Sequence, residues 1–317
     1  MDNSSKITFF ILTVYEDVGN IKYFYFSILL VLKFSIYMTN SLLIVVIFTN
    51  QRLHEPMYVF LCNLFVNELY GSTALLPALL LNLLSDTHEV SSACCFLQIF
   101  CLYTYASVEF CNLAAMAYDR YLSICYPLHY RNIMTACKVY TLIVFIWVYS
   151  FVKFSITLSL NLQLPLCGNT IHKVGCDNFS LIRLACTDTT LNNIYGLCST
   201  VVTIAVPLTP ILYSYAKIIR ICYNSSKEAQ RKALNTCTPH LISLMNFSIG
   251  SFFEVVQNRF DLTYVPSVIR ITLSVYFLLC PPLFNPIMYG IKITKIRQAV
   301  QKWFSAKSIV PQLEYSK

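Results

Sequence analysis

Seven long apolar stretches constrain the fold of this chain more than any other feature. They run approximately over residues 24–48, 57–83, 95–124, 137–160, 194–219, 234–257 and 267–289. Each reaches the ~20 residues that a helix needs to cross ~30 Å of hydrocarbon. The 317 residues are 56% hydrophobic and 12% charged, whereas a soluble domain carries roughly 25% charged residues. The sequence therefore predicts an all-α membrane protein, a seven-transmembrane helix bundle.

The seven spans form a single domain, because no repeat, low-complexity tract or linker divides the chain. We expect an outer tail over 1–23, the helix bundle over 24–289 and an inner tail over 290–317, with the termini on opposite sides. The inner tail has the pattern of a short amphipathic helix on the membrane surface. Its apolar side carries Ile296, Val300, Trp303 and Phe304.

Positive charge orients the bundle. Most of the 23 lysine and arginine residues follow the first, third and fifth spans or lie in the C-terminal tail. Cytoplasmic loops are enriched in Lys and Arg, so the N-terminus should be extracellular and the C-terminus cytoplasmic, in the plasma membrane. Glycosylation sequons that begin at Asn3 and Asn178 then lie outside.

The signatures of soluble enzymes and metal sites are absent. The 7 glycines lack the spacing of phosphate-binding loops or a nucleophile elbow, and neither HExxH nor CxxC occurs. Much of the net charge of +8 lies on the inner face, where it meets anionic lipid rather than nucleic acid. The sequence predicts neither an enzyme nor a nucleic-acid-binding protein.

Some of the 14 cysteines lie on or near the oxidising outer face, where disulfides form. They are Cys94, Cys95, Cys167, Cys176 and Cys186. Four of them could form two bridges in three pairings. Spacing alone does not choose between the adjacent Cys94 and Cys95.

Ionisable residues inside the spans are costly and should face the bundle interior. Glu68 and Glu109 form either a polar or cation site, or a pair of neutral acids in a packed bundle. Lys153 either binds an acidic ligand or, as we favour, snorkels outward or meets a loop carboxylate. Proton relay in a small transporter or channel would use such acids too, but the internal repeat that would support a transporter is missing.

An ordered set of motifs resembles the odorant-receptor family of rhodopsin-like G-protein-coupled receptors. The strongest is the run 116–130, from Met-Ala-Tyr-Asp-Arg-Tyr to Pro-Leu-His-Tyr, which is similar to the family signature at the inner end of helix three. The others, in family order, are Asn40-Ser41-Leu42, Pro56-Met57-Tyr58, Cys62-Asn63-Leu64, Ser214-Tyr215, 232–241 and 281–290. The likeness covers nearly the whole chain, and several segments look like teleost olfactory receptors.

The resemblance implies partners and disulfides. A small-molecule odorant or water-soluble chemical cue would activate a stimulatory, olfactory-type heterotrimeric G protein and raise cAMP. No cofactor is implied, and a sodium ion near Glu68 and Glu109 is the one candidate ion. The family's helix-three cysteine lies three residues before a glutamine, here Gln98, which implies the pairs Cys95–Cys176 and Cys167–Cys186. Cys94 is left without an explanation.

The resemblance also implies a two-state switch in the inner half of the bundle. In the off state, Arg120 should pair with Asp119 and with polar groups at the foot of helix six. An agonist would swing helix six outward and free Arg120 for the G-protein α subunit. The implied switch residues are Asp119, Arg120, Tyr121, Tyr215, His240, Asn285, Pro286 and Tyr289, and the polar site adds Glu68 and Glu109 to Asn285.

By analogy, the ligand pocket lies in the outer half, between helices three, five, six and seven. On helix three, the residues chosen have the spacing of one helix face. The predicted lining is Tyr103, Ala106, Ser107, Phe110, Ser199, Thr203, Ser251 and Val255, each of which could instead be ordinary helix packing. Such a pocket suits a small ligand with one or two hydrogen-bonding groups.

The chain departs from the family pattern at four positions. Glu68 stands where the family usually has Asp, and Thr39 replaces a Gly. Ser248 occupies a position that is typically aromatic, and Pro239 precedes His240. The last two changes bear on the details of switching and not on the class.

Overall fold

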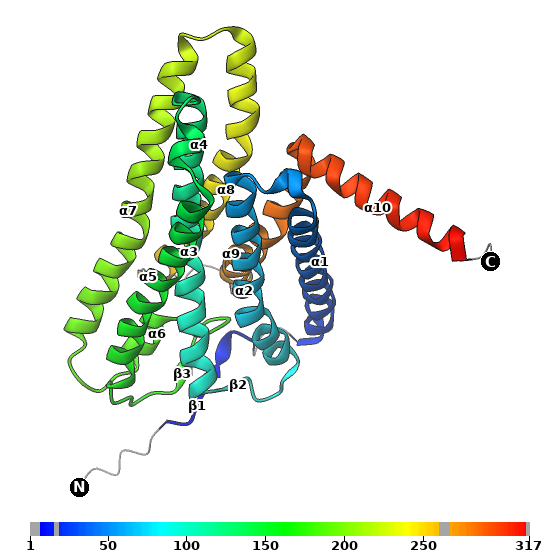
Figure 1. The fold of residues 1–317 in the computed structure, drawn as a ribbon. Helices are drawn as coiled ribbons and strands as arrows, with labels where there is room; N and C mark the ends of the chain where they lie inside the picture. Colours follow the sequence, from blue (N-terminus) through cyan, green and yellow to red (C-terminus); the bar gives the residue numbers. More distant parts are fainter. Residues whose placement is uncertain (1–6, 16–18, 260–266, 315–317) are drawn as a thin grey trace.

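A bundle of seven long helices dominates the computed structural model, which describes residues 7–15, 19–259 and 267–314 (Figure 1). The helices are α1 (Lys22–Thr49), α2 (Pro56–Leu84), α3 (Ser92–Cys125), α5 (Ala136–Leu162), α7 (Thr190–Tyr223), α8 (Lys227–Arg259) and α9 (Ser267–Lys292). Each one coincides with a predicted apolar span. After a break at Ile293, α10 (Thr294–Glu314) turns away from the bundle. The predicted fold class is therefore confirmed.

Local sequence signals set several helix starts. Ser91 caps α3 by accepting a hydrogen bond from the backbone N–H of Cys94, and Thr135 caps α5 in the same way for Lys138. Pro56 occupies the first position of α2, where its missing N–H costs nothing. Short helices α4 (Tyr130–Ile133) and α6 (Asn178–Arg183) lie in the connections.

Six of the long helices among the described residues are long and apolar enough to cross a membrane: α1, α2, α3, α5, α7 and the Thr272–Lys292 part of α9. The seventh, α8, begins with charged residues and continues through many hydroxyl and amide side chains. Its polar composition suits a helix whose inner side chains are hydrogen-bonded to neighbouring helices.

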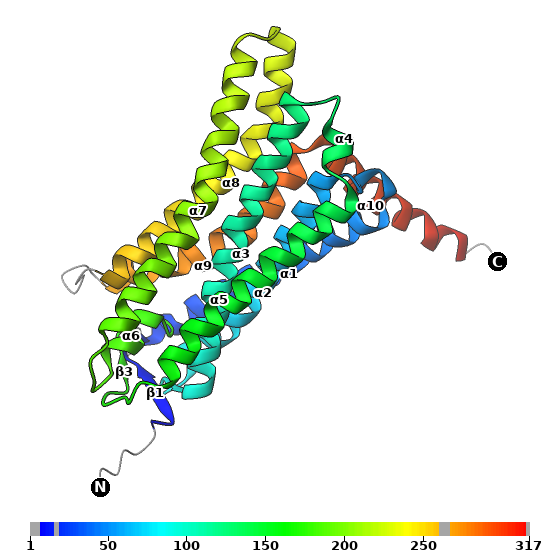
Figure 2. The same cartoon turned by 60° about the vertical axis from the view of Figure 1, so that its left-hand side comes forward.

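Helix α3 lies at the centre and contacts α2, α5, α7 and α8, while α9 packs against α1, α2 and α8. Figure 2 shows α7 and α8 projecting together beyond the rest of the bundle. We call this end, which also carries α4 and α10, the inner end, and the opposite end the outer end.

A small sheet closes the outer end. Strand β1 (Phe9–Leu12) pairs antiparallel with β2 (Glu89–Ser91) and parallel with β3 (Thr170–Ile171). The outer tail is thus partly a strand, where the sequence analysis expected only a tail. Its side chains Phe10 and Leu12 are fully buried, so the tail forms part of the outer core.

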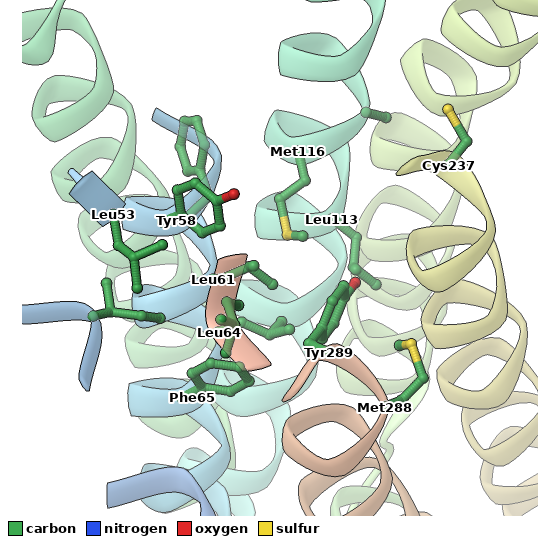
Figure 3. Close-up of a cluster of buried hydrophobic side chains, with 14 of the residues drawn as sticks. Leu53, Tyr58, Leu61, Leu64, Phe65, Leu113, Met116, Cys237, Met288 and Tyr289 are labelled. Carbon is green, nitrogen blue, oxygen red and sulfur yellow. The ribbon is translucent and has the colours of Figure 1, made fainter. Parts of the chain in front are cut away.

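The inner half has its own apolar core. It joins α2, α3 and α9 through side chains such as Leu64, Leu113 and Tyr289 (Figure 3). Ile296 and Ala299 of α10 are buried against it, and Trp303 packs beside them. Phe304, which was predicted on the same side of the helix, is exposed instead.

Candidate functional site

A charged cluster lies at the inner end of α3. The Nε atom of Arg120 donates to Oδ2 of Asp119 at 3.1 Å, and a second guanidinium nitrogen bonds the same oxygen. Tyr130 of the adjacent connection donates to Oδ1 of Asp119 at 2.7 Å. Burial raises the pKa of Tyr130 well above its ordinary value, so its hydroxyl keeps the proton that it donates. Asp119 thereby holds Arg120 and the connection together.

A buried histidine connects three helices beside this cluster. Nδ1 of His240 in α8 lies 2.7 Å from the Tyr215 hydroxyl of α7, and its Nε2 lies 2.9 Å from the Leu113 carbonyl of α3. One ring nitrogen donates to the carbonyl, so the other accepts from the tyrosine. The two rings also stack, with centroids 5.6 Å apart. His240 thus fastens the inner part of α8 to its neighbours.

The remaining predicted switch residues lie close to this region. Tyr289 is buried and its ring meets Phe65 edge-on at 6.4 Å. Pro286 is buried within α9, one turn before it. Tyr121 is half-buried and contacts Tyr126 and Tyr213. The expected pairing of Arg120 with polar groups at the foot of helix six is not seen in the part of the chain that the structure describes. Among the described residues, both hydrogen bonds of the Arg120 side chain go to Asp119.

A polar centre lies at mid-depth. Asn285 of α9 donates to Glu68 at 2.6 Å and to Glu109 at 3.4 Å, and accepts from Ser243 of α8 at 2.8 Å. Tyr105 donates to Glu68 at 2.9 Å, and Asn67 donates to Glu109 at 2.8 Å. The network therefore joins α2, α3, α8 and α9 through fully buried side chains.

This centre also has the chemistry of a cation site. Neither Glu68 nor Glu109 forms an ion pair with a described lysine or arginine. The Oδ1 atom of Asn67 is buried and accepts no hydrogen bond from any described residue. Buried carboxylates without a counter-charge are costly, so these oxygens suit either a shared proton or a hard cation such as sodium.

A cavity of about 1020 Å³, counted with its opening to solvent, lies in the outer half between α3, α5, α6, α7, α8 and α9. Most of the predicted lining residues reach it: Tyr103, Ala106, Phe110, Ser199, Thr203, Ser251 and Val255. Ser107 does not line it. Its hydroxyl is fully buried and accepts from Ser150 of α5 at 2.9 Å, so it belongs to the α3–α5 packing.

Several lining residues were missed in the sequence analysis. They come from α5, α8 and α9 and from α6 in the connection between α5 and α7. They include Phe154 and Thr157 of α5, Asn178, Phe179 and Ile182 of α6, Glu254 of α8 and Phe277 of α9. Helix periodicity pointed to α3, α7 and α8 but gave no signal for a folded connection. The adjoining cysteines could have given one, because bridged loops are held against the bundle.

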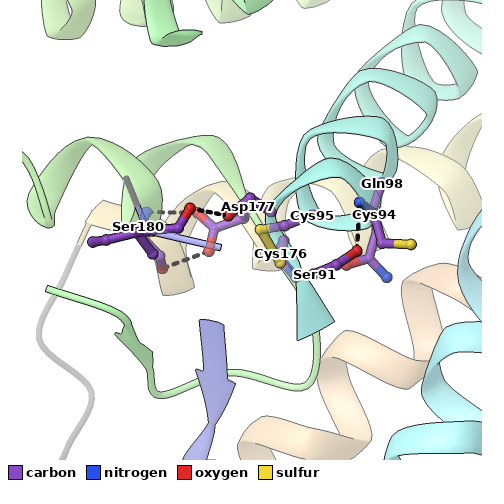
Figure 4. Close-up of a disulfide and its surroundings, with 9 residues drawn as sticks. Ser91, Cys94, Cys95, Gln98, Cys176, Asp177 and Ser180 are labelled. Atoms are coloured by element: carbon purple, nitrogen blue, oxygen red, sulfur yellow. Dashed lines mark hydrogen bonds between the residues drawn. A yellow bond between two sulfur atoms is a disulfide. The ribbon is translucent and has the colours of Figure 1, made fainter. Parts of the chain in front are cut away.

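Two disulfides hold the outer connection between α5 and α7 against the cavity. Cys95 of α3 is joined to Cys176, and Cys167 to Cys186, with Cα atoms 5.3 and 5.4 Å apart. These are the pairings that the family resemblance implied. Figure 4 shows Cys94 turned away from the bridge; it is exposed and its backbone N–H takes part in the cap of α3.

The connection is further fixed by local hydrogen bonds. Gln98 accepts from the Cys176 backbone N–H at 2.8 Å, and Asp177 caps α6 by accepting from Phe179 and Ser180 (Figure 4). Asn178, a predicted glycan acceptor, is buried and its side chain is hydrogen-bonded to Asn161. That burial argues against a glycan there. The other predicted acceptor, Asn3, lies outside the described residues.

Lys153 of α5 differs from its expected arrangement. Its ammonium neither extends outward nor meets a loop carboxylate; it donates to the Thr203 hydroxyl of α7. It also lies 4.9 Å from the ring centre of Phe154 and 5.6 Å from that of Tyr149. The lysine therefore lies directly behind one wall of the cavity.

Comparison with known proteins identifies the family of the chain. Residues 26–307 match the family model described as "Olfactory receptor". The chain belongs to the olfactory receptor family. It is 33% identical to human olfactory receptor 11A1 over 302 residues, which covers 94% of each chain. It is 36% identical to human olfactory receptor 52D1, with 83% of each chain covered, and 31% identical to mouse olfactory receptor 4B13, with 97% of this chain and 99% of the relative covered.

The family is one of odorant-sensing G-protein-coupled receptors that are not enzymes. This olfactory receptor is therefore a multi-pass membrane protein with a signalling role. The charged cluster, the histidine contact and the outer cavity are the parts of its structure to which that role can be related.

Proposed function

We propose that this receptor binds a small odorant or water-soluble chemical cue in its outer cavity and activates a stimulatory, olfactory-type G protein, which raises cAMP. The observation that carries the proposal is the contact between the cavity and the polar centre. Phe110 lines the cavity and meets Phe247 at 4.9 Å, and Phe247 meets Tyr105 at 5.8 Å. Tyr105 in turn bonds Glu68 in the polar centre.

The inner end would act as the switch. In the off state, Asp119 holds Arg120, and His240 fastens α8 to α3 and α7. A ligand that binds better when α8 has moved outward shifts the equilibrium by its differential affinity. Arg120 would then meet the G protein, and Tyr215 and Tyr289 would support the open arrangement. Tyr121, Asn285 and Pro286 complete the set of proposed switch residues.

The whole chain would act as one receptor unit, with an outer tail over 1–23, the bundle over 24–289 and an inner tail over 290–317. The concentration of Lys and Arg near the inner end supports an extracellular N-terminus and a cytoplasmic C-terminus at the plasma membrane. Asn3 is the glycan acceptor that this orientation favours. We also assign the chain to the teleost type of the family on its sequence style.

A sodium ion is the proposed occupant of the polar centre. Glu68, Glu109 and the Oδ1 atom of Asn67 would hold it, because hard cations prefer oxygen ligands. A bound ion would neutralise the buried carboxylates and stabilise the arrangement of α2, α3 and α9 seen in the structure.

The experiment is a cAMP assay in cells that contain the stimulatory G protein, with an odorant panel and measured surface expression. Arg120→Ala should abolish the response and leave surface expression nearly unchanged. Arg131→Ala, an exposed arginine of the neighbouring connection, is the matched control and should respond normally. Full signalling by Arg120→Ala would contradict the proposed mechanism.

A further inference from the structure

Lys153 is a membrane-embedded cation without a counter-charge. Its ammonium can donate three hydrogen bonds, and the described residues accept one of them, at Thr203. None of the ion pairs in the described part of the chain involves Lys153. The Tyr149 and Phe154 rings give it partial compensation through their faces. An anion placed next to this ammonium would gain far more than it would in water.

The cavity wall in front of Lys153 carries hydrogen-bond donors. Thr203 and Ser199 lie one turn apart on α7 and both line the cavity. The Ser199 hydroxyl is buried, with 9% of the residue exposed, and has no hydrogen-bond partner among the described residues. The Thr203 hydroxyl donates to the Ser199 carbonyl at 2.6 Å and can rotate toward the cavity instead. The Thr203 and Ser199 hydroxyls therefore lie one turn apart on the cavity wall, with the Lys153 ammonium bonded to Thr203 directly behind it.

The rest of the cavity is mainly apolar near this spot. Phe110, Phe154 and Ile204 line the neighbouring surface, from α3, α5 and α7. A ligand placed here would bury an apolar body beside one hydrogen-bonding end, which is the usual composition of a small-molecule site.

We propose that Lys153, Thr203 and Ser199 form an anion subsite, which takes the carboxylate of an otherwise apolar ligand. This proposal rests on the proposed function, because it assigns the ligand class of the same cavity. The carboxylate accepts from the Lys153 ammonium and the Ser199 hydroxyl, and the Thr203 hydroxyl turns toward it. Charge-assisted hydrogen bonds of this kind are roughly twice as strong as neutral ones.

Glu254 offers an alternative, in which the cavity selects a cationic ligand. It lines the same cavity from α8, a helix that does not supply any of the three donors. If Glu254 governed ligand choice, ammonium compounds would bind best and Glu254→Gln would abolish their binding. The carboxylate proposal predicts the reverse order of head groups and a dependence on Lys153.

The test uses the full receptor, purified in lipid nanodiscs, and three probes that share one tail: octanoate, octanamide and octylamine. Dissociation constants are measured by thermal-shift titration at neutral pH, which needs no G protein. Octanoate should bind about tenfold or more tightly than octanamide, and Lys153→Met should remove that preference. Lys153→Arg should retain most of it, because it keeps the charge.

Lys33→Met is the matched control, since Lys33 is also a lysine within a span but lies on α1, which contributes nothing to the described lining. It should leave the preference intact. Equal or tighter binding of octanamide or octylamine to the unaltered receptor would overturn the proposal, as would a retained preference in Lys153→Met. A carboxylate preference without a cAMP response would instead refute the proposed coupling and leave the anion subsite standing.

Discussion

The His240 contact makes a quantitative prediction about basal activity. His240→Phe keeps an aromatic ring beside Tyr215, but it removes both hydrogen bonds, at 2.7 Å to Tyr215 and 2.9 Å to the Leu113 carbonyl. Hydrogen bonds between membrane helices average about 0.6 kcal/mol and reach about 1.7 kcal/mol. The two together therefore stabilise the closed position of α8 by about 1–3 kcal/mol.

That free energy acts directly on the switch equilibrium. A change of about 1–3 kcal/mol corresponds to roughly 5- to 150-fold. If the open state is about 1% populated without ligand, a tenfold shift raises it to roughly 10%. We expect His240→Phe to raise ligand-independent cAMP severalfold at matched surface expression.

Two further variants sharpen this measurement. Tyr215→Phe removes one of the two hydrogen bonds of His240, but it also removes the hydroxyl proposed to support the open arrangement. It should therefore give a smaller increase in basal cAMP. His129→Phe is the control, because His129 is an exposed histidine of the inner connection. Basal cAMP that is unchanged or lower in His240→Phe, with normal surface expression, would refute the assignment of His240 as a closing contact.

Four other expectations can be measured on the same receptor. Sodium should raise the melting temperature of the purified protein above its value in choline chloride, and Glu109→Gln should remove that difference; an equal sodium effect in the variant would contradict the proposed ion site. Cys95→Ser should lose surface expression, since removing a disulfide typically costs about 2–5 kcal/mol, and normal expression would show that the bridge is dispensable. Trp147→Phe breaks the 2.9 Å hydrogen bond to Asn63 and should lower the free energy of unfolding by about 1 kcal/mol; an unchanged melting temperature would show that this bond does not stabilise the receptor. An N-terminal epitope tag should be stained by antibody on intact cells, and staining only after permeabilisation would reverse the proposed orientation.

The helices were predictable because their main determinant is local. Each span needs ~20 apolar residues, and the sequence shows this directly. Caps such as Ser91 and Thr135 then fix the start of a helix to within a few residues. The strand Phe9–Leu12 was not predicted, since its partners lie about 80 and 160 residues away and pairing at that distance leaves little trace in a short segment.

The candidate site was predictable where one helix face decides the contact. Tyr103, Ala106 and Phe110 follow helical spacing and do line the cavity, but Ser107 lies at the edge of that face and turns to Ser150. The depth of Lys153 in the membrane was predictable from its place in the span, but the direction of its side chain was not, because that depends on where α7 places a hydroxyl. The folded outer connection could not be placed from periodicity at all.

A ligand in the outer cavity is proposed to open the inner end of the bundle to a G protein. The most direct measurement is nucleotide exchange on a purified stimulatory G protein, catalysed by the purified receptor in lipid with and without a ligand shown to bind. We expect the ligand to accelerate exchange with the unaltered receptor and to have no effect with Arg120→Ala. Confirmed ligand binding without any acceleration of exchange would contradict this coupling between the cavity and the inner end.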